Sequence, residues 1–374
     1  MSKELNIGIV GAGGFARFAT NAFLKVPGIK IVAVMDVSEM LAEQMAIELS
    51  AKAYLDYETF LADGRIDLVY VATPPFLHYP QSKMALQAGK HVICEKPAAL
   101  RVCEAEELSR LAQSLQLLYT VNLMQRYNPL YDTVAIIIKE KMLGNFLHGF
   151  FENYASDEYL TADHWFWDES KSGGIFIEHG VHFFDLFSGW LGEGKVVNAV
   201  QLQRANGKSR IIDRVQATVL YENGTVNFYH GFDQPKILDR QEMRLQFERG
   251  DITLYEWVPV RMRLHGLLQE KQLERLRELT GEFSTVNHKQ PQMTNQKLTG
   301  RHNKITFDEW ATIEHGNVSE KQNRYQEMLT AMITDQWNWI NDHKHIRVID
   351  DKNAVQSLRM AAEANRMANN FNLK

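Results

Sequence analysis

The N-terminal third of the chain alternates short apolar runs with stretches that have helical spacing. Ser38–Leu49 is one such helical stretch between two apolar runs. Strands that are apolar on both faces and alternate with helices predict a parallel, doubly wound α/β sheet. Five runs have the length and composition of such strands: Leu5–Val10, Ile29–Met35, Leu68–Ala72, His91–Cys94 and Leu118–Val121.

The pattern changes in the middle of the chain, between Gly144 and Trp257. Val215–Tyr221 and Val226–His230 flank a turn that contains an Asn-Gly pair, and Met243–Phe247 and Ile252–Trp257 are joined by a similarly short turn. Turns this tight connect antiparallel strands, because parallel strands need a long crossover. The sequence therefore predicts an α+β region with a large, mostly antiparallel open sheet.

The C-terminal part is more polar. Arg261–Lys321 is predicted to begin with a helix near Leu264–Leu279 and to continue through a Gln/Asn/Thr-rich loop or arm near Asn287–Asn303. Ala354–Asn370 has the composition of a packed helix. The prediction is thus a parallel-sheet domain at 1–125, an α+β domain at 126–350, and a C-terminal helix at 351–374 that packs back on the first domain.

Length, charge and cysteine content narrow the class of protein. At 374 residues the chain suits two domains, and its net charge of −5 argues against a nucleic-acid partner. Cys94 and Cys103 provide no disulfide framework, which fits a reducing compartment. The polar start Met1–Asn6 reads as no signal peptide, and no apolar run reaches membrane-spanning length. We expect a cytoplasmic protein with no membrane partner.

A glycine-rich segment lies between the first strand and the first helix. It runs Gly11-Ala12-Gly13-Gly14-Phe15-Ala16 and has the pattern G-x-G-x-x-A. Gly11 permits a tight turn, Gly13 lets the backbone approach a pyrophosphate, and the small Ala16 allows close packing of helix on sheet. The free N–H groups at the start of the helix attract an anion. Alone, such a run is also typical of an ordinary turn.

Asp36 supplies the context that the glycine-rich segment needs. It ends the second strand 20 residues after Ala16, where a carboxylate accepts hydrogen bonds from an adenosine ribose. A simple strand-end cap is the alternative. Because a carboxylate repels a 2′-phosphate and Val37-Ser38 offers no arginine, the pattern predicts NAD as the cofactor in preference to NADP.

Cys94-Glu95-Lys96-Pro97 follows the predicted strand His91–Cys94. Open α/β sheets bind ligands at the carboxyl ends of their strands, so Lys96 is expected within reach of a nicotinamide. Pro97 keeps Lys96 out of the helical conformation. An oxidised nicotinamide is a like charge that favours neutral lysine, which suits proton transfer. The alternative is a surface lysine paired with Glu95.

A second polar motif occurs within Gly173–Asp185. On a regular helix, Glu178, His182 and Asp185 share one stripe at i, i+4 and i+7. A carboxylate on either side of an imidazole suits a general base, with Glu178 or Asp185 fixing the tautomer of His182. A buried polar stripe at an interface is one alternative. A metal site at Glu178, His179 and His182 is another, but no cysteine supports it and we expect none.

These motifs, in this order and spacing, resemble the Gfo/Idh/MocA family, which includes glucose–fructose oxidoreductase and inositol dehydrogenase. The resemblance rests on Gly11–Ala16, Asp36, Ala72–Pro75 with His78, Cys94–Pro97 and Gly173–Asp185. It implies that Lys96 and His182 are the catalytic pair and that Glu178 assists them. The family usually has aspartate in place of Glu178, so the proton route and the substrate fit are in doubt.

The resemblance also implies which residues bind the ligands. The positions that match the cofactor-binding motifs are Gly11, Gly13, Gly14, Phe15, Ala16, Asp36, Thr73, Pro74, His78, Glu95 and Lys96. Arg126, Trp165, His182 and Asp185 are expected to contact the substrate. The aromatic residues around Trp165 suit either stacking on a sugar-like ring or packing in the core.

By resemblance, the protein is an NAD-dependent oxidoreductase that transfers hydride between nicotinamide and a secondary alcohol of a sugar, sugar acid or cyclitol-like substrate. A homodimer or homotetramer formed through the antiparallel sheet is also implied. Two other functions stay open. One is an NAD-dependent glycosidase that uses transient redox chemistry on the same fold. The other is a non-catalytic dinucleotide-binding sensor, which the presence of both Lys96 and His182 disfavours.

Overall fold

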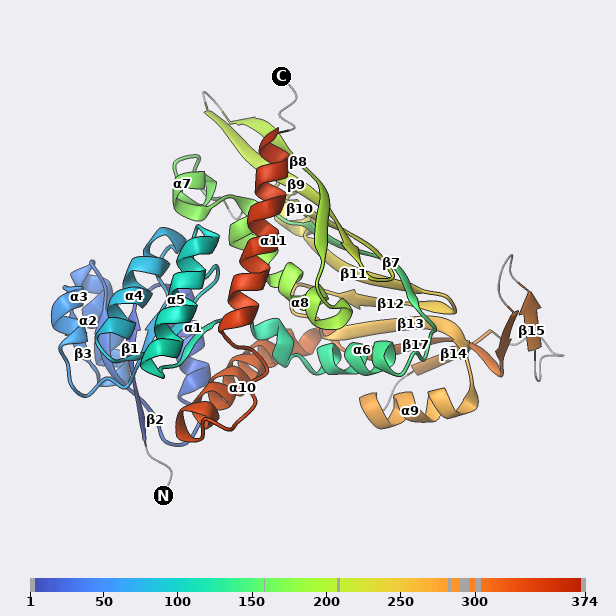
Figure 1. Ribbon diagram of the computed structural model, residues 1–374, viewed down its shortest axis with the longest axis horizontal. Coiled ribbons are helices and arrows are strands. Elements are labelled where there is room, and N and C mark those ends of the chain that lie inside the picture. The colour runs from blue at the N-terminus through green and yellow to red at the C-terminus, as the bar shows by residue number, and fades with distance from the viewer. Residues whose placement is uncertain are drawn as a thin grey trace.

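Two sheets of different kinds form the framework of the protein. The computed structural model describes residues 4–157, 159–206, 209–281, 284–288, 296–299 and 304–370. In Figure 1 the smaller, six-stranded sheet and its helices lie on the left, and the nine-stranded sheet lies on the right. No helix within these ranges is long and apolar enough to span a lipid bilayer.

The six-stranded sheet is parallel throughout and has the order β3-β2-β1-β4-β5-β6. Its strands are β1 Leu5–Val10, β2 Ile29–Met35, β3 Lys52–Tyr54, β4 Leu68–Val71, β5 His91–Cys94 and β6 Tyr119–Val121. The helices between them are α1 Gly14–Phe23, α2 Glu39–Leu49, α3 Tyr57–Leu61, η1 Pro75–Leu77, α4 His78–Gln87 and α5 Val102–Leu115. The strand order reverses between β1 and β4, and open α/β sheets bind ligands in the crevice at the carboxyl ends of the strands at such a reversal. The predicted parallel, doubly wound sheet is confirmed, and it has the arrangement of a Rossmann fold.

The nine-stranded sheet has the order β14-β17-β13-β12-β11-β7-β10-β9-β8. Its strands are β7 Phe146–Tyr154, β8 Lys195–Asn206, β9 Ser209–Tyr221, β10 Gly224–Gly231, β11 Arg240–Phe247, β12 Gly250–Tyr255, β13 Arg261–Leu268, β14 Ser284–Asn287 and β17 Glu309–Gly316. Strands β7 and β10 pair in parallel, and the other described pairs are antiparallel. Both predicted hairpins, β9–β10 and β11–β12, are confirmed.

Helix α8, Val181–Leu191, packs against this sheet through aromatic side chains. Phe183 stacks on Phe151 of β7 with a centroid distance of 3.5 Å, and Phe184 and Phe187 contact Phe228 of β10. All five rings are fully buried. The motif that carries Glu178 and His182 is therefore anchored to the sheet by large apolar contacts.

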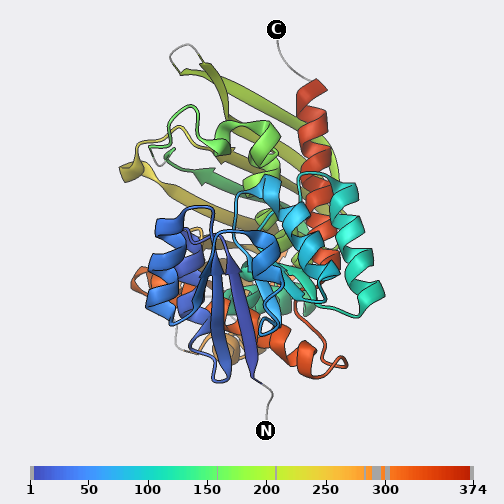
Figure 2. The ribbon, with the colours of Figure 1, turned by 90° about the vertical axis from the view of Figure 1, so that its left-hand side faces the viewer.

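Two long helices join the sheets. Helix α10, Lys321–Asn341, packs on α1 and on η2, Met124–Tyr127. Helix α11, Asp351–Asn370, packs on α5, α8 and β8, and Figures 1 and 2 show it in red beside the helices of the first domain. The predicted C-terminal helix is present and does contact the first domain. The remaining elements are α6 Pro129–Lys139, η3 Trp165–Trp167, α7 Glu169–Ser172, η4 Phe176–Gly180, η5 Lys236–Leu238, α9 Glu270–Thr280, β15 Gln296–Thr299, β16 Lys304–Phe307 and η6 Val318–Glu320.

Three details of the sequence prediction need correction. The helix expected at Leu264–Leu279 is instead strand β13 followed by α9, because β13 buries every second residue. Strand β3 was missed, since it has three residues and none of them is buried. Helix α10 was not predicted. The expected loop at Asn287–Asn303 falls partly outside the described residues, and the described part contains β15, which pairs with β16.

Candidate active site

The glycine-rich turn after β1 has the shape of an anion cradle. Gly11 has φ +90°, and a Cβ there would lie 2.6 Å from the carbonyl oxygen of Ala72, so only glycine fits. A Cβ on Gly13 or Gly14 would meet no described atom within 4 Å. Helix α1 starts at Gly14 with no side-chain cap, which leaves its first N–H groups available. This open, amide-lined space fits a pyrophosphate.

Asp36 lies at the end of β2 and is fixed against this turn. Its carboxylate accepts a hydrogen bond from the backbone N–H of Ala12 and another from that of Ser38, both at 2.8 Å. Each carboxylate oxygen keeps a further lone pair for a ligand. The side chain therefore caps the strand end and still offers acceptors to a ribose.

Lys96 follows β5 and reaches across to the second domain. Its Nζ donates a hydrogen bond of 2.9 Å to the backbone oxygen of Glu178 and forms an ion pair with the Glu178 carboxylate. The side chain of Glu95 turns the other way and accepts hydrogen bonds from Tyr70 and Asn122. Burial raises the pKa of Glu95. The partner of Lys96 is thus Glu178 rather than its chain neighbour Glu95.

The segment before α8 is a π-helical turn, Phe176–Gly180. A π turn contains an extra residue, so it rotates Glu178 away from the position that a regular helix would give it. As a result, Glu178 faces Lys96, while Asp185 faces Arg126. The prediction that Glu178, His182 and Asp185 share one stripe of a regular helix is therefore wrong, because Glu178 and Asp185 contact different partners.

His182 lies beside the Lys96–Glu178 pair and is 4% exposed. Among the described residues, none hydrogen-bonds its Nδ1, so neither Asp185 nor Glu178 fixes the imidazole tautomer as expected. Burial and the positive charge of Lys96 hold the pKa of His182 well below its usual range. The imidazole is consequently neutral near pH 7 and can accept a proton.

The side chain of His179 points toward the nine-stranded sheet and away from the Lys96–Glu178 pair. Its Nδ1 lies 2.9 Å from Nδ1 of His230 on β10, and its ring contacts Phe232. Burial lowers the pKa of His230 to about 3, and burial with the charge of His230 also lowers that of His179. Within the described ranges, no three histidine, cysteine or acidic residues lie close enough to share a metal ion.

Arg126 and Asp185, both expected to contact substrate, are bonded to each other. Arg126 Nε and Nη2 donate to the two carboxylate oxygens of Asp185 at 2.8 Å, and Nη2 also donates to its backbone oxygen at 2.8 Å. The Asp185 side chain is 2% exposed. This forked pair connects the start of the second domain to α8. A role for either residue in substrate binding stays a prediction.

His78 connects the turns after β4 and β5. Its two ring nitrogens lie 2.7 Å and 2.6 Å from the backbone oxygens of Thr73 and Pro97, and burial lowers its pKa. Pro74 precedes η1, and the Thr73 hydroxyl donates to Gln81 at 2.6 Å. The buried His78 holds both turns in place, whereas Thr73 and Pro74 remain partly accessible beside the crevice.

Trp165 belongs to the aromatic segment η3, whose rings are half-buried. It contacts His164 and Phe166, and Phe166 in turn contacts Phe232 after β10. The segment thus contacts the second domain through Phe166 and is still partly accessible. This placement is compatible with both expectations, that these aromatic rings stack on a sugar-like ring and that they pack in the core.

Family profiles match both domains. The profile described as "Oxidoreductase family, NAD-binding Rossmann fold" matches residues 5–123, and that of the "GFO/IDH/MocA C-terminal domain" matches residues 131–253, together well over half of the chain. The chain belongs to the Gfo/Idh/MocA family of oxidoreductases. The predicted family, enzyme class and NAD-binding domain are therefore confirmed.

One relative of this Gfo/Idh/MocA protein is the uncharacterized oxidoreductase YrbE of Bacillus subtilis. The two sequences are 24% identical over a match that covers 63% of this chain and 71% of the YrbE chain. The scyllo-inositol 2-dehydrogenase (NAD(+)) of Bacillus subtilis is 27% identical over 57% of this chain and 59% of its own. Other curated relatives are matched over about half of their length. The fold is similar to that of the WlbA dehydrogenase of Bordetella pertussis, solved with NADH and UDP-GlcNAcA, at a TM-score of 0.80, 18% identity and coverage of 99% and 97%.

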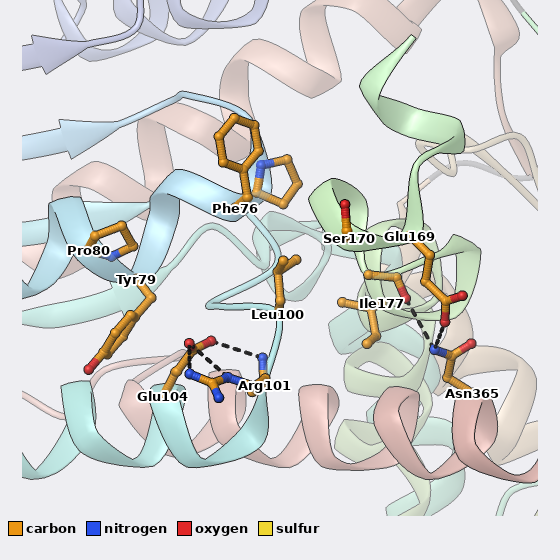
Figure 3. A pocket seen from close by; sticks show the side chains of 12 residues that line it. Phe76, Tyr79, Pro80, Leu100, Arg101, Glu104, Glu169, Ser170, Ile177 and Asn365 are labelled. Carbon is orange, nitrogen blue, oxygen red and sulfur yellow. Dashed lines mark hydrogen bonds and ion pairs between the residues drawn. The ribbon is translucent and has the colours of Figure 1, made fainter. Parts of the chain in front are cut away.

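A cavity of about 320 Å³ lies beside the site of this Gfo/Idh/MocA protein, and Figure 3 shows its walls. Phe76 and Leu100 come from the first domain, Ile177 and Ser170 from the second, and Asn365 from α11. The dashed lines in Figure 3 join polar side chains of the wall to one another, as in the Arg101–Glu104 and Glu169–Asn365 pairs. These wall groups are therefore already paired with one another, whereas Nδ1 of His182 has no partner among the described residues.

Two aromatic residues near the catalytic candidates were missed from the sequence. Trp257 lies with its ring centroid 5.0 Å from that of His182, and Tyr325 of α10 stacks against Trp257 at 6.2 Å. The spacing of Met328, Leu329, Met332 and Ile333, all fully buried, is a helical signal that could have identified α10. No sequence signal brings Tyr325 to Trp257, because that contact depends on how α10 docks.

Proposed function

We propose that this protein is an NAD-dependent dehydrogenase that oxidises a secondary alcohol of a sugar, sugar acid or cyclitol-like substrate, or reduces the corresponding ketone. The observation that carries the proposal is the Lys96–Glu178 pair beside a neutral His182 without a hydrogen-bond partner at Nδ1 among the described residues. The substrate class is supported by the scyllo-inositol dehydrogenase and by the UDP-GlcNAcA complex of the structural relative.

Lys96 orients the substrate oxygen in this proposal. An ammonium group has three N–H donors, and the carbonyl and carboxylate of Glu178 engage two of them. The third is left for the hydroxyl oxygen of the substrate. Because Glu178 holds Lys96 from two sides, the donor keeps one direction and stabilises negative charge as it develops on that oxygen.

His182 accepts the hydroxyl proton. Burial and the charge of Lys96 lower the pKa of His182, so its imidazole is neutral near pH 7 and a ring nitrogen can accept a hydrogen bond from the substrate hydroxyl. NAD, when bound, supplies the acceptor for the hydride that leaves the carbon. The oxygen thus loses its proton to His182 while Lys96 bonds the forming carbonyl, and the reverse reaction returns that proton.

Nicotinamide absorbance tests this function. Purified protein is mixed with NAD and a panel of sugars, sugar acids, inositols and aryl glycosides. A rise in absorbance with one group of alcohols is the expected result and defines the substrate class. Release of the aryl group with no net absorbance change would support the glycosidase instead. Tight NAD binding with neither reaction across the panel would support the sensor.

We further propose that NAD is preferred over NADP and that the protein forms a homodimer or homotetramer through its nine-stranded sheet. The cofactor preference is supported by the fixed carboxylate of Asp36. The oligomer is supported by aromatic and arginine side chains on the face opposite α8, including Phe150, Tyr154, Tyr229 and Arg244. Light scattering coupled to gel filtration should give a mass of two or four chains, and a monomer at micromolar concentration would contradict it.

A further inference from the structure

Trp257 lies beside the catalytic candidate His182. It belongs to none of the sequence motifs and falls outside the residues that the family profiles match. Its indole contacts the ring of His182 at 5.0 Å and that of Phe183 at 5.8 Å. The side chain is only partly buried, although Val258 and Leu254 around it are fully buried. The indole therefore lies against His182 and keeps part of its surface accessible.

The turn that carries Trp257 is fixed by contacts from several parts of the chain. Glu256 has φ +78°, a conformation that non-glycine residues rarely adopt and that is retained only when surrounding contacts enforce it. The carboxamide of Gln125 donates to the Trp257 carbonyl at 2.7 Å, and that of Asn128 donates to the Pro259 carbonyl at 2.8 Å. The indole is consequently presented in one position before any ligand binds.

Helix α10 supports the same turn from the other side. Lys321 pairs with Glu256 at 2.9 Å, and Tyr325, one helical turn later, stacks on Trp257 with 26° between the ring planes. Tyr325 also contacts Phe15 of the glycine-rich turn at 6.2 Å. An aromatic row thus runs from the cofactor turn through Tyr325 and Trp257 to His182.

The row ends at a polar atom that has no hydrogen-bond partner. Among the described residues, none hydrogen-bonds Nδ1 of the buried His182, whose ring lies against the indole of Trp257. An aromatic wall beside the imidazole of His182 and near the ammonium of Lys96 suits a ligand with an apolar C–H face and hydroxyl groups around its rim. Cyclic sugars and cyclitols have this chemistry, and open-chain polyols do not present one flat face.

We propose that Trp257 is the platform on which the C–H face of a cyclic sugar or cyclitol rests, so that this residue selects ring substrates over open-chain polyols. This inference rests on the proposed dehydrogenase function. The indole fixes the plane of the ring beside His182, and Lys96 approaches the reacting hydroxyl at its rim. Tyr325 supports the indole and links it to the cofactor turn.

The test compares Trp257→Leu and Trp257→Phe with the wild type, using D-glucose, D-glucuronate and myo-inositol as ring probes and sorbitol as the open-chain probe. Trp257→Leu should raise KM for the preferred ring probe by about tenfold, leave KM for sorbitol and the Kd for NAD unchanged, and erase the ring preference. Trp257→Phe should fall between the two. Trp339→Phe, a change at a half-buried tryptophan of α10 that stacks on His343, is the matched control and should leave the ring preference, KM and the Kd for NAD unchanged.

Ligand binding without turnover separates this inference from the function on which it rests. Saturation-transfer NMR with NAD present should show the ring C–H protons of a bound probe receiving magnetisation in the wild type and losing it in Trp257→Leu. If the wild type binds ring probes in this way but catalyses no reaction, the proposed dehydrogenase function would be contradicted and the proposed role of Trp257 would stand. Equal ring preference in wild type and Trp257→Leu, or no binding of any ring probe, would overturn the platform. Thermal unfolding confirms that each variant is folded.

Discussion

Lys96 is held by two atoms of one residue, the carbonyl oxygen and the carboxylate of Glu178. The two residues lie 82 positions apart in the chain and belong to different domains. The position of the Lys96 ammonium therefore depends on the correct docking of the domains. Glu178 belongs to the π turn Phe176–Gly180, and its carboxylate lies directly at Lys96.

Glu178→Gln should lower kcat by about ten- to a hundredfold, because the amide keeps the shape and the backbone contact but loses the charge that holds the Lys96 ammonium. The Kd for NAD should not change. Glu178→Asp is the control, since it restores the family's usual carboxylate and should retain more activity than the amide. Steady-state kinetics and a fluorescence titration with NADH measure both quantities. Full turnover by Glu178→Gln would show that the carboxylate is not needed.

Asp36→Ala should reduce the preference for NAD over NADP. We expect the wild type to prefer NAD by about a hundredfold, because the carboxylate opposes a 2′-phosphate, and the variant to prefer it by less than about tenfold. The ratio of the two Kd values is the proper readout, since loss of the Ala12 contact will weaken both cofactors together. Comparable affinities in the wild type would contradict the assigned role of Asp36.

Arg126→Met should destabilise the fold by about 3–5 kcal/mol, because it leaves the buried Asp185 carboxylate without its partner. Denaturant unfolding gives this free energy. The double variant Arg126→Met/Asp185→Leu removes both charges and should recover part of the loss. An increase in KM with no loss of stability would instead support the contact with substrate that the sequence predicts for Arg126.

The free energy of unfolding should decrease as the pH falls below about 6.5, the pKa of histidine in an unfolded chain. The pKa of His230 is about 3 in the folded protein, so between these values the unfolded state binds a proton that the folded state does not. This difference lowers stability by up to about 1.4 kcal/mol per pH unit. His230→Asn should therefore flatten the decrease between about pH 6 and pH 4.5.

The exposed His148 provides the control for that measurement. His148→Asn should leave the slope of stability against pH as it is in the wild type. An identical slope in His230→Asn and the wild type would mean that the His179–His230 contact does not exclude protons in the folded state.

The fold was largely predictable because the strongest signals are local. The alternation of apolar strands and helices, the glycine-rich turn and the Asn-Gly hairpin each depend on residues close together in the sequence. Errors occurred where the local signal is short or ambiguous. Strand β3 lies at an edge without a buried residue, and β13 contains leucines that also suit a helix.

The residues proposed for the candidate site come from local sequence motifs, whereas their contacts do not. Lys96, Glu178 and His182 were selected from motifs, and the structure brings them together. The partners of Asp185 and Arg126 were not foreseen, because a regular helix was assumed where a π turn shifts the register. Trp257 and Tyr325 reach the crevice through the docking of α10, which no local pattern encodes.

The most direct test of the proposed chemistry is nicotinamide reduction by Lys96→Ala, compared with the wild type on the substrate that the panel identifies. We expect a Kd for NAD within about twofold of the wild type and a loss of kcat greater than about a hundredfold. A kcat nearly equal to that of the wild type would contradict the role of Lys96 and, with it, the proposed mechanism.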